Sequence, residues 1–258
     1  MKMKKILSVV LVAACTISMA ACGSNASKSN GSDNSSSDSS DTLVMATNAE
    51  FPPYEYYDGD EIVGIDAEFA AAIADKLGMK LKIEDMAFDS IIPAVQGGKA
   101  DFGAAGITVT DERKTQVDFS DSYYTGRQVI IVTEDSTIAS PDDLEGKKMG
   151  VQLGTTGDLY VSGDYGDENV ERFNKGFEAV QSLLQGKIDA VVIDDQPAKA
   201  FVAENDGLKI LDTEYIEEEY AFCFKKDSKL VDQVNEAIAS LQADGTFDKI
   251  VAKYITAE

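Results

Sequence analysis

The chain has 258 residues, a formal net charge of −23 at pH 7 and no histidine. The missing histidine excludes His-based acid–base catalysis, the Ser-His-Asp and Cys-His arrangements and the commonest zinc ligand. The sequence has no basic patch, so neither nucleic-acid binding nor electrostatic docking on an anionic membrane is expected. Of three cysteines, only Cys223 falls in the predicted folded part. We therefore expect no internal disulfide and interpret Cys223 as a small buried residue.

Residues 1–21 have the composition of a secretory signal peptide. Three lysines lead into the apolar run 6–14, and small residues follow up to Cys22. The stretch is too short and too asymmetrically flanked for a transmembrane span. Residues 19–23 also match a bacterial lipobox, in which Cys22 becomes the lipidated N-terminus. Cys15 fits the same short pattern but would leave a cramped apolar region. Cleavage without lipid is the alternative.

Residues 22–41 are predicted to form a flexible tether. From Gly23 to Asp41 the chain is almost all Ser, Asn, Gly, Asp and Lys, with no apolar side chain larger than alanine. Such a composition cannot bury a core. The folded part begins near Thr42 and holds about 215 residues, enough for one large domain or two of about 100 residues.

From Thr42 onward, strand patterns and helix patterns alternate. Strands are predicted at residues 43–46, 100–107, 128–132, 148–151 and 190–193. Helices are predicted at residues 66–77, 91–96, 179–185, 230–241 and 246–254. This alternation favours an α/β fold with mainly parallel sheets. Ligands bind outside the carboxyl ends of strands in such sheets, so the loops that follow the strands should converge on a cleft.

A faint internal repeat predicts two similar lobes. A helix, a glycine stop, a charged turn and a buried strand occur in residues 91–107 and again in residues 179–193. Chance similarity between two short stretches is the alternative. We assign residues 42–126 and 222–258 to lobe 1 and residues 127–221 to lobe 2, which returns the last two helices to the first lobe.

The stretch from Ala105 to Arg113 has the pattern of a carboxylate receiver. Thr110 is expected to cap a short helix whose first turn is acidic. Unpaired N–H groups at a strand-to-helix corner attract anions. Arg113, one turn into the helix, can bind a carboxylate with two parallel hydrogen bonds. The alternative is a capped surface helix whose Arg113 pairs with a nearby acid.

Two aromatic residues lie at predicted strand ends. Phe51 is in the loop 47–57, which two prolines stiffen, and Phe88 follows a different strand. Rings that face each other across a cleft can enclose the aliphatic or cationic part of a ligand side chain. The alternative is a hydrophobic plug over the lobe, which we favour for Tyr54, Tyr56 and Tyr57.

Two further strand ends carry groups that suit opposite charges. Gly154–Gly157 offers turn N–H groups and two hydroxyls, a neutral receiver for an oxyanion, although such turns are common. Asp194 ends a buried strand and suits an ammonium group, or it serves only the turn that follows. Glu217–Glu219 is interpreted as a solvated charge run, and no metal site is assigned.

Taken together, these motifs resemble family 3 of the extracellular solute-binding proteins, the polar amino-acid receptors of ABC importers. The resemblance covers nearly all of residues 42–254. Its marks are Gly106–Arg113 with Asp118–Ser120, Pro141–Val151 with Gly154–Thr156, Asp189–Asp194 and Ala243–Thr246. It implies a two-lobed periplasmic-binding-protein fold of type II, whose lobes are joined by two crossing strands.

The resemblance implies a role for each residue at the carboxylate end of the site. Arg113 matches the arginine that pairs with the α-carboxylate of the ligand. Thr108 and Thr156 match supporting donors to the same group, with Thr155 beside them.

The resemblance also implies how the ammonium group and the side chain are held. Asp194 matches the acid that takes the α-ammonium, and Ala105 and Gly106 match residues whose carbonyls help. Many relatives carry serines at those two positions, so only the backbone contributes here. Phe51 and Phe88 match aromatic walls around the ligand side chain.

The implied protein is a monomeric, lipid-anchored receptor on the outer face of the bacterial cell membrane. It captures a free L-amino acid, passes it to an ABC permease, and needs neither chemistry nor a cofactor. Asn48 and Glu50 favour a cationic or amide side chain, so Arg, Lys, His and Gln are candidates; alternatively Glu50 points to solvent. A ligand-presenting sensor and, less readily, a dehydratase on the same fold are the alternatives. A zwitterion needs partners of both signs, so binding should draw the lobes together.

Overall fold

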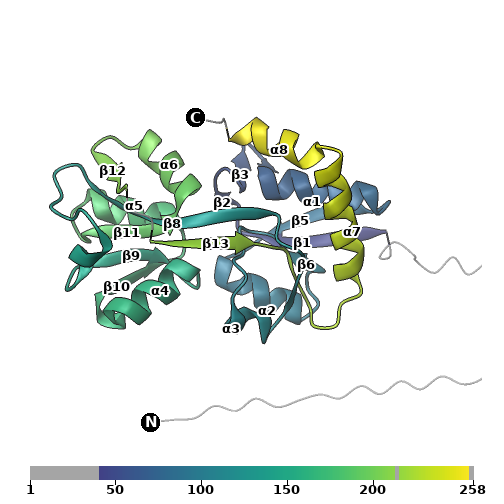
Figure 1. Cartoon of the computed structure of the whole chain (residues 1–258), viewed down its shortest axis with the longest axis horizontal. Coiled ribbons are helices and arrows are strands. Elements are labelled where there is room, and N and C mark those ends of the chain that lie inside the picture. The colour runs from purple at the N-terminus through teal and green to yellow at the C-terminus, as the bar shows by residue number, and fades with distance from the viewer. Residues whose placement is uncertain (1–40, 213–214, 256–258) are drawn as a thin grey trace, which may run out of the picture. The chain divides into compact units, whose positions relative to one another are not determined.

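The computed structural model describes residues 41–212 and 215–255. Within them the chain forms two α/β lobes joined by two long strands (Figure 1). The predicted signal peptide, Cys22 and nearly all of the predicted tether lie outside the described residues. Among the helices of the described part, none combines the length and apolarity needed to cross a bilayer.

The first lobe is a five-stranded sheet with helices on both faces. In their order in the sheet, its strands are β5 (Lys80–Asp85), β1 (Thr42–Thr47), β6 (Phe102–Gly103), β14 (Cys223–Phe224) and β7 (Asp118–Phe119). On one face, three helices pack against one another: α1 (Ile65–Lys76), α7 (Leu230–Ala243) and α8 (Thr246–Tyr254). The other face carries η1 (Phe88–Ser90), α2 (Ile91–Gln96) and α3 (Asp111–Lys114) (Figure 1). The predicted bounds of α2 and α8 are confirmed.

The second lobe is a six-stranded sheet. Its strands are β10 (Val170–Phe173), β9 (Met149–Gln152), β11 (Ala190–Asp194), β8 (Tyr124–Thr133) and β12 (Leu208–Ile210), with β13 (Ile216–Tyr220) also paired to β8. The surrounding helices are η2 (Pro141–Leu144), α4 (Thr156–Tyr165), η3 (Asp167–Asn169), α5 (Gly176–Leu184) and α6 (Asp195–Glu204). All residues of β9 and β11 are buried, as expected for strands covered on both faces.

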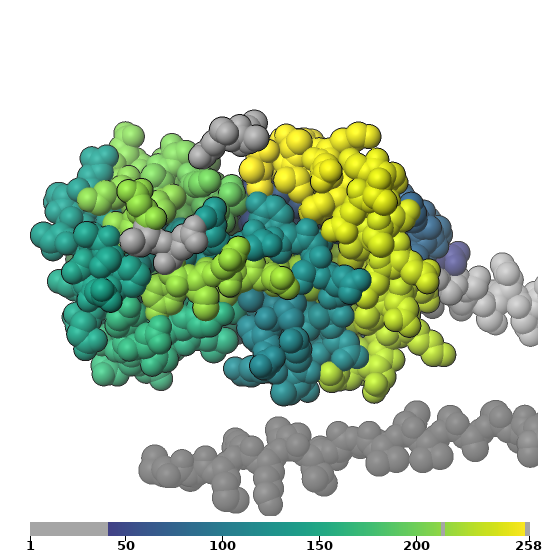
Figure 2. Space-filling model, in the orientation of Figure 1, coloured from purple at the N-terminus to yellow at the C-terminus, as the bar shows by residue number. Residues whose placement is uncertain are grey.

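β8 and β13 are the crossing strands. They pair antiparallel from Ile216 opposite Gln128 to Tyr220 opposite Tyr124. In the space-filling view, the yellow-green atoms of β13 lie on the surface between the lobes (Figure 2). The two-lobed α/β fold is confirmed, but both sheets are mixed rather than mainly parallel. In the described residues, β1 pairs parallel with β5 and β6, and β9 with β10 and β11, while β8 and β14 pair antiparallel with all their neighbours. The antiparallel strands arise because the chain crosses between the lobes and then returns.

The loop after β1 folds into a small antiparallel sheet that the sequence did not predict. Its strands are β2 (Glu50–Phe51), β3 (Glu55–Asp58) and β4 (Glu61–Val63). Tyr54, between β2 and β3, is fully buried edge-on against Tyr124 and Tyr220, and so forms a hydrophobic plug. Tyr57 remains about half exposed.

The predicted strand at residues 100–107 is much shorter than expected. Only Phe102–Gly103 pairs as β6, although Ala104–Ile107 stay buried. The cause is Gly106, which has a φ of +53° and turns the chain away from the sheet. Its N–H donates to the buried carboxylate of Asp66 at 2.9 Å.

Candidate functional site

A cavity lies between the two lobes, at the carboxyl ends of their central strands. Its lining residues are Asn48, Phe51, Glu55, Phe88, Ala105, Gly106, Thr108, Arg113, Gln152, Thr155, Thr156 and Asp194. The structure thus brings together every predicted ligand-binding residue except Glu50. Glu55 and Gln152 are additions that the sequence reasoning missed.

Arg113 is the cation of this cavity. The Thr110 side chain caps α3 and accepts the Arg113 N–H at 3.1 Å, as predicted. The buried guanidinium donates through Nη1 to the carbonyl of Thr108 at 2.8 Å and through Nη2 to that of Gly154 at 3.0 Å. Its central carbon lies 5.5 Å from the ring centroid of Phe88. Burial lowers the pKa of Arg113, yet a guanidinium stays charged. Arg113 is therefore held by a carbonyl from each lobe, and its positive charge in the cavity suits an anion.

The turn after β9 places a helix N-terminus beside this guanidinium. Thr155 caps α4, accepting the Asp158 N–H at 3.3 Å, and the Oγ1 atoms of Thr156 and Thr108 lie 3.5 Å apart. Gly154 has a φ of +79°, and a Cβ there would lie 3.2 Å from the Cβ of Asp89 in the other lobe. The positive φ and this close approach both favour glycine. The positive end of α4 and the Arg113 cation together suit a carboxylate.

Asp194 is a buried acid of the cavity lining, and Glu218 is a second buried acid, bonded to Thr108 of the lining. Asp194, the last residue of β11, is buried and accepts a hydrogen bond from the hydroxyl of Tyr220. Glu218 accepts from Thr108 Oγ1 and Gln128 Nε2, both at 3.0 Å. Burial, reinforced by the charge of Glu218, raises the pKa of Asp194 to about 7. A cationic ligand group beside Asp194 would restore its ionised form.

The interpretation of Glu217–Glu219 as a solvated charge run was wrong for its middle residue. Successive side chains of a strand point to opposite faces, so β13 exposes Glu217 and Glu219 and buries Glu218 and Tyr220. The sequence pattern of three consecutive acids did not reveal which face of the strand would be covered.

Glu55 is a buried acid that the sequence reasoning left within an aromatic cluster. It is 1% exposed, and neither of its carboxyl oxygens forms a hydrogen bond of ordinary geometry among the described residues, although the Asp66 carboxyl lies close enough to interact with it. Burial, together with the nearby charge of Asp66, raises the pKa of Glu55 well above its usual range. Asp66 itself accepts from Gly106 N–H and from the Tyr123 hydroxyl at 2.7 Å, and burial raises its pKa to about 6. The sequence feature that could have indicated a buried Glu55 is its place between two tyrosines, Tyr54 and Tyr56.

Gln152 and Asn48 connect the lobes at the side of the cavity. Gln152 Nε2 donates to Asn48 Oδ1 at 2.8 Å, and Asn48 Nδ2 donates to the carbonyl of Met86 at 2.9 Å. Gln152 is the last residue of β9, so the rule that placed ligands at strand ends would have found it.

Glu50 lies outside the cavity lining. Its carboxylate pairs with Lys175 of the other lobe, and the Lys175 ammonium lies 5.8 Å from the ring centroid of Phe177. Glu50, Tyr57 and Phe177 line a separate surface groove. Glu50 thus joins the lobes without facing the cavity.

Cys223 is buried and unpaired within the described part of the chain, as predicted. Burial raises the pKa of its thiol to about 12. Across residues 41–212 and 215–255, no group of three or more acidic or cysteine side chains is arranged to hold a metal ion.

Comparison with known proteins agrees with this geometry. The sequence profile of the bacterial extracellular solute-binding proteins, family 3, matches residues 43–257. The arginine-binding extracellular protein ArtP of Bacillus subtilis (strain 168) is 38% identical over 262 residues, covering 99% of this chain and 100% of ArtP.

Two solved structures show the same fold. An ancestral arginine-binding protein bound to arginine is 43% identical, with a TM-score of 0.79 over 83% of this chain and 98% of that one. The arginine-, lysine-, histidine-binding protein ArtJ from Geobacillus stearothermophilus is 32% identical, with a TM-score of 0.81 over 84% and 96%.

The buried acids predict how stability depends on pH. The pKa values of Asp194 and Asp66 are higher in the folded chain than in an unfolded one, so the folded state holds extra protons. Their stabilising contribution is complete below about pH 4 and is lost as the pH rises through 6 to 7. We expect the unfolding temperature of the ligand-free protein to fall between pH 5 and pH 8. Asp194→Asn should flatten this dependence in calorimetric scans, and an unchanged slope would contradict the assignment.

Because the Glu50–Lys175 pair joins the two lobes, removing it should shift the equilibrium between closed and open protein. A partly exposed pair contributes at most about 1 kcal/mol, so Glu50→Gln should change the ratio of closed to open protein by no more than about fivefold. Small-angle scattering of the ligand-free variant should report a larger radius of gyration. The double charge swap Glu50→Lys with Lys175→Glu should reverse the change. Lys253→Met, which breaks a pair to Glu68 within one lobe, is the control.

Proposed function

Because the chain belongs to family 3 of the bacterial extracellular solute-binding proteins, we propose that it binds a free L-amino acid with a cationic side chain and delivers it to an ABC importer. The observation that carries this proposal is the placement of Arg113 and Asp194 in one buried cavity between the lobes. A zwitterion has one group for each of them.

The α-carboxylate is assigned to the Arg113 end of the cavity. There the guanidinium and the N-terminus of α4 both favour an anion, with the hydroxyls of Thr108, Thr155 and Thr156 alongside. The α-ammonium is assigned to Asp194, with the carbonyls of Ala105 and Gly106 as neutral acceptors. Leaving either buried charge unpaired would cost several kcal/mol, which makes the site selective for zwitterions.

The side chain of the ligand is assigned to the part of the cavity that contains Glu55. The lining carries one basic residue, Arg113, and two acidic residues, Asp194 and Glu55. A ligand with a second positive charge gives the Glu55 carboxylate a charge-assisted hydrogen bond and favours its ionised form, whereas a neutral side chain offers at most a weaker, uncharged hydrogen bond. Phe51 and Phe88 then enclose the apolar stem, and Asn48 and Gln152 offer amide groups. A planar guanidinium fits a carboxylate best, so we rank arginine before lysine and histidine.

The proposed location of the protein is the outer face of the cell membrane. We propose that Cys22 is lipidated after removal of residues 1–21, that residues 22–41 tether the monomeric protein to the outer face of the cell membrane, and that the ligand leaves chemically unchanged. Residues 42–126 and 222–258 would form one moving body and residues 127–221 the other, with β8 and β13 as the hinge.

Titration calorimetry with a panel of free amino acids tests the proposed function. The wild-type protein should bind arginine, and Arg113→Ala should weaken binding about a hundredfold or more, because removing one partner of a buried charge pair costs about 3–5 kcal/mol. The unfolding temperature verifies that the variant folds. Retained affinity would show that the carboxylate anchor is misassigned. Failure of the wild-type protein to bind any amino acid at millimolar concentration would overturn the function itself.

Glu55 predicts the order of ligands. Glu55→Gln should lower the affinity for arginine about tenfold or more, because a charge-assisted hydrogen bond is lost, while the affinity for glutamine is retained or increased. Glu50→Gln is a matched control, since it falls outside the cavity lining and should lower the affinities for arginine and glutamine by the same factor, no more than about fivefold, through weaker lobe closure. Equal losses for arginine and glutamine would contradict a side-chain role for Glu55.

A further inference from the structure

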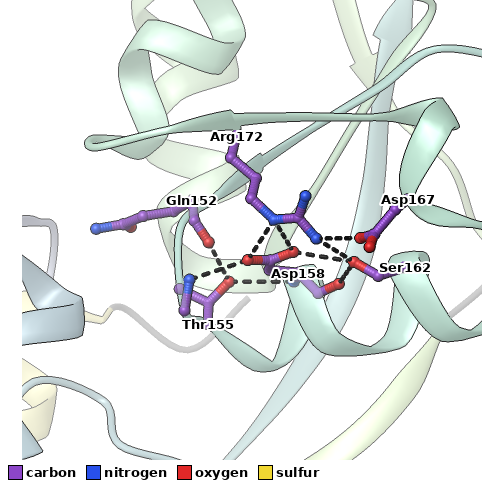
Figure 3. A network of polar contacts seen from close by, with 7 residues as sticks. Gln152, Thr155, Asp158, Ser162, Asp167 and Arg172 are labelled. Atoms are coloured by element: carbon purple, nitrogen blue, oxygen red, sulfur yellow. Dashed lines mark hydrogen bonds and ion pairs between the residues drawn. The ribbon is translucent and has the colours of Figure 1, made fainter.

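Arg172 is the centre of a polar network beside the turn Gly154–Thr156, which links β9 to α4 (Figure 3). It lies on β10 and does not line the cavity. Its Nε donates to the two carboxylate oxygens of Asp158 at 2.8 and 3.0 Å. Its Nη2 donates to Ser162 Oγ at 2.8 Å and to Asp167 Oδ1 at 2.6 Å. The guanidinium therefore has charged partners on α4 and η3, and the geometry fixes it in place.

Asp158 transmits this network to the turn. Its side chain is 7% exposed, and its Oδ2 accepts the Gly154 N–H at 3.1 Å. Thr155 Oγ1 accepts the Asp158 N–H and donates to the carbonyl of Gln152 at 2.8 Å. In Figure 3 the Gln152 side chain points away from the network. Asp158 thus fixes the N-terminus of α4 through bonds outside the cavity, whereas Thr155 and Thr156 line the cavity.

The turn Gly154–Thr156 is the part of lobe 2 that contacts Arg113. The Gly154 carbonyl accepts from Arg113 Nη2 at 3.0 Å, and Thr155 and Thr156 line the cavity. The turn lies close to lobe 1, since a Cβ built on Gly154 would lie 3.2 Å from the Cβ of Asp89. Asp158 also places a negative charge at the same helix end that is assigned to the carboxylate of the ligand.

We propose that Arg172 is a positioning residue for binding of the ligand α-carboxylate. It neutralises Asp158, so that this buried carboxylate does not repel the ligand, and it keeps the turn at Gly154–Thr156 aligned with Arg113. The proposal rests on the proposed amino-acid-binding function, and it assigns Arg172 no direct contact with the ligand.

The test compares L-arginine with L-argininamide, whose carboxamide lacks the negative charge, by titration calorimetry on the full folded protein. Arg172→Met should lower the affinity for arginine about tenfold and the affinity for argininamide much less, so the ratio of the two affinities falls. Arg172→Lys should recover part of the ratio, because it keeps a positive charge beside Asp158. Asp167→Asn, which removes a different partner of Arg172, should leave the ratio unchanged.

An equal loss for both ligands, or an unchanged ratio, would overturn the proposal and leave Arg172 with a structural role alone. Arg172→Gln keeps a hydrogen-bond donor to Asp158, and the same ratio measured on it decides the matter if the methionine variant does not fold. If the wild-type protein binds neither ligand, the proposed function fails first, and the two failures are therefore distinguishable.

Discussion

A buried guanidinium that reaches across two lobes is the constraint on which the rest of this structure depends. Arg113 leaves lobe 1 from a short capped helix and donates to the carbonyl of Gly154 in lobe 2. Carbonyl dipoles satisfy its hydrogen bonds but do not cancel its charge. The site therefore favours closure and an anion at the same time. The left-handed glycine at 154 and the threonines of the cavity lining lie beside that cation.

The opposite constraint is an excess of buried acid. Asp194, Glu218, Glu55 and Asp66 lie in or beside the cavity, and burial holds protons on some of them at neutral pH. A dense acidic cluster with one cation is costly when empty and is relieved by a ligand that brings positive charge. Ligand binding, lobe closure and protonation are consequently linked through the same few residues.

Residues outside the cavity hold its walls. Glu50 and Lys175 join the lobes at a surface groove, and Arg172 pairs with Asp158, whose carboxylate accepts the Gly154 N–H. Each ion pair connects two different elements, and none of the four paired residues lines the cavity. We infer that affinity depends on these two ion pairs as well as on contact residues, since a site that is free to shift loses the alignment that a small, charged ligand requires.

Local patterns in the sequence determined the helix cap at Thr110, the bounds of α2 and α8, the two-lobed α/β fold and most cavity residues. The cap, the helix bounds and the fold class follow from short-range rules of capping, helical period and strand alternation, whereas Thr108, Ala105 and Gly106 were placed in the site by the resemblance to the family. Tertiary structure alone decided that Glu218 is buried, that Glu55 faces the cavity, that Glu50 pairs with Lys175, and that the sheets are mixed. Those outcomes depend on which face of a strand is covered and on contacts such as the 125-residue separation between Glu50 and Lys175. Local sequence carries no information about such packing, because an acid in a strand has the same neighbours in sequence whether its face meets water or another lobe.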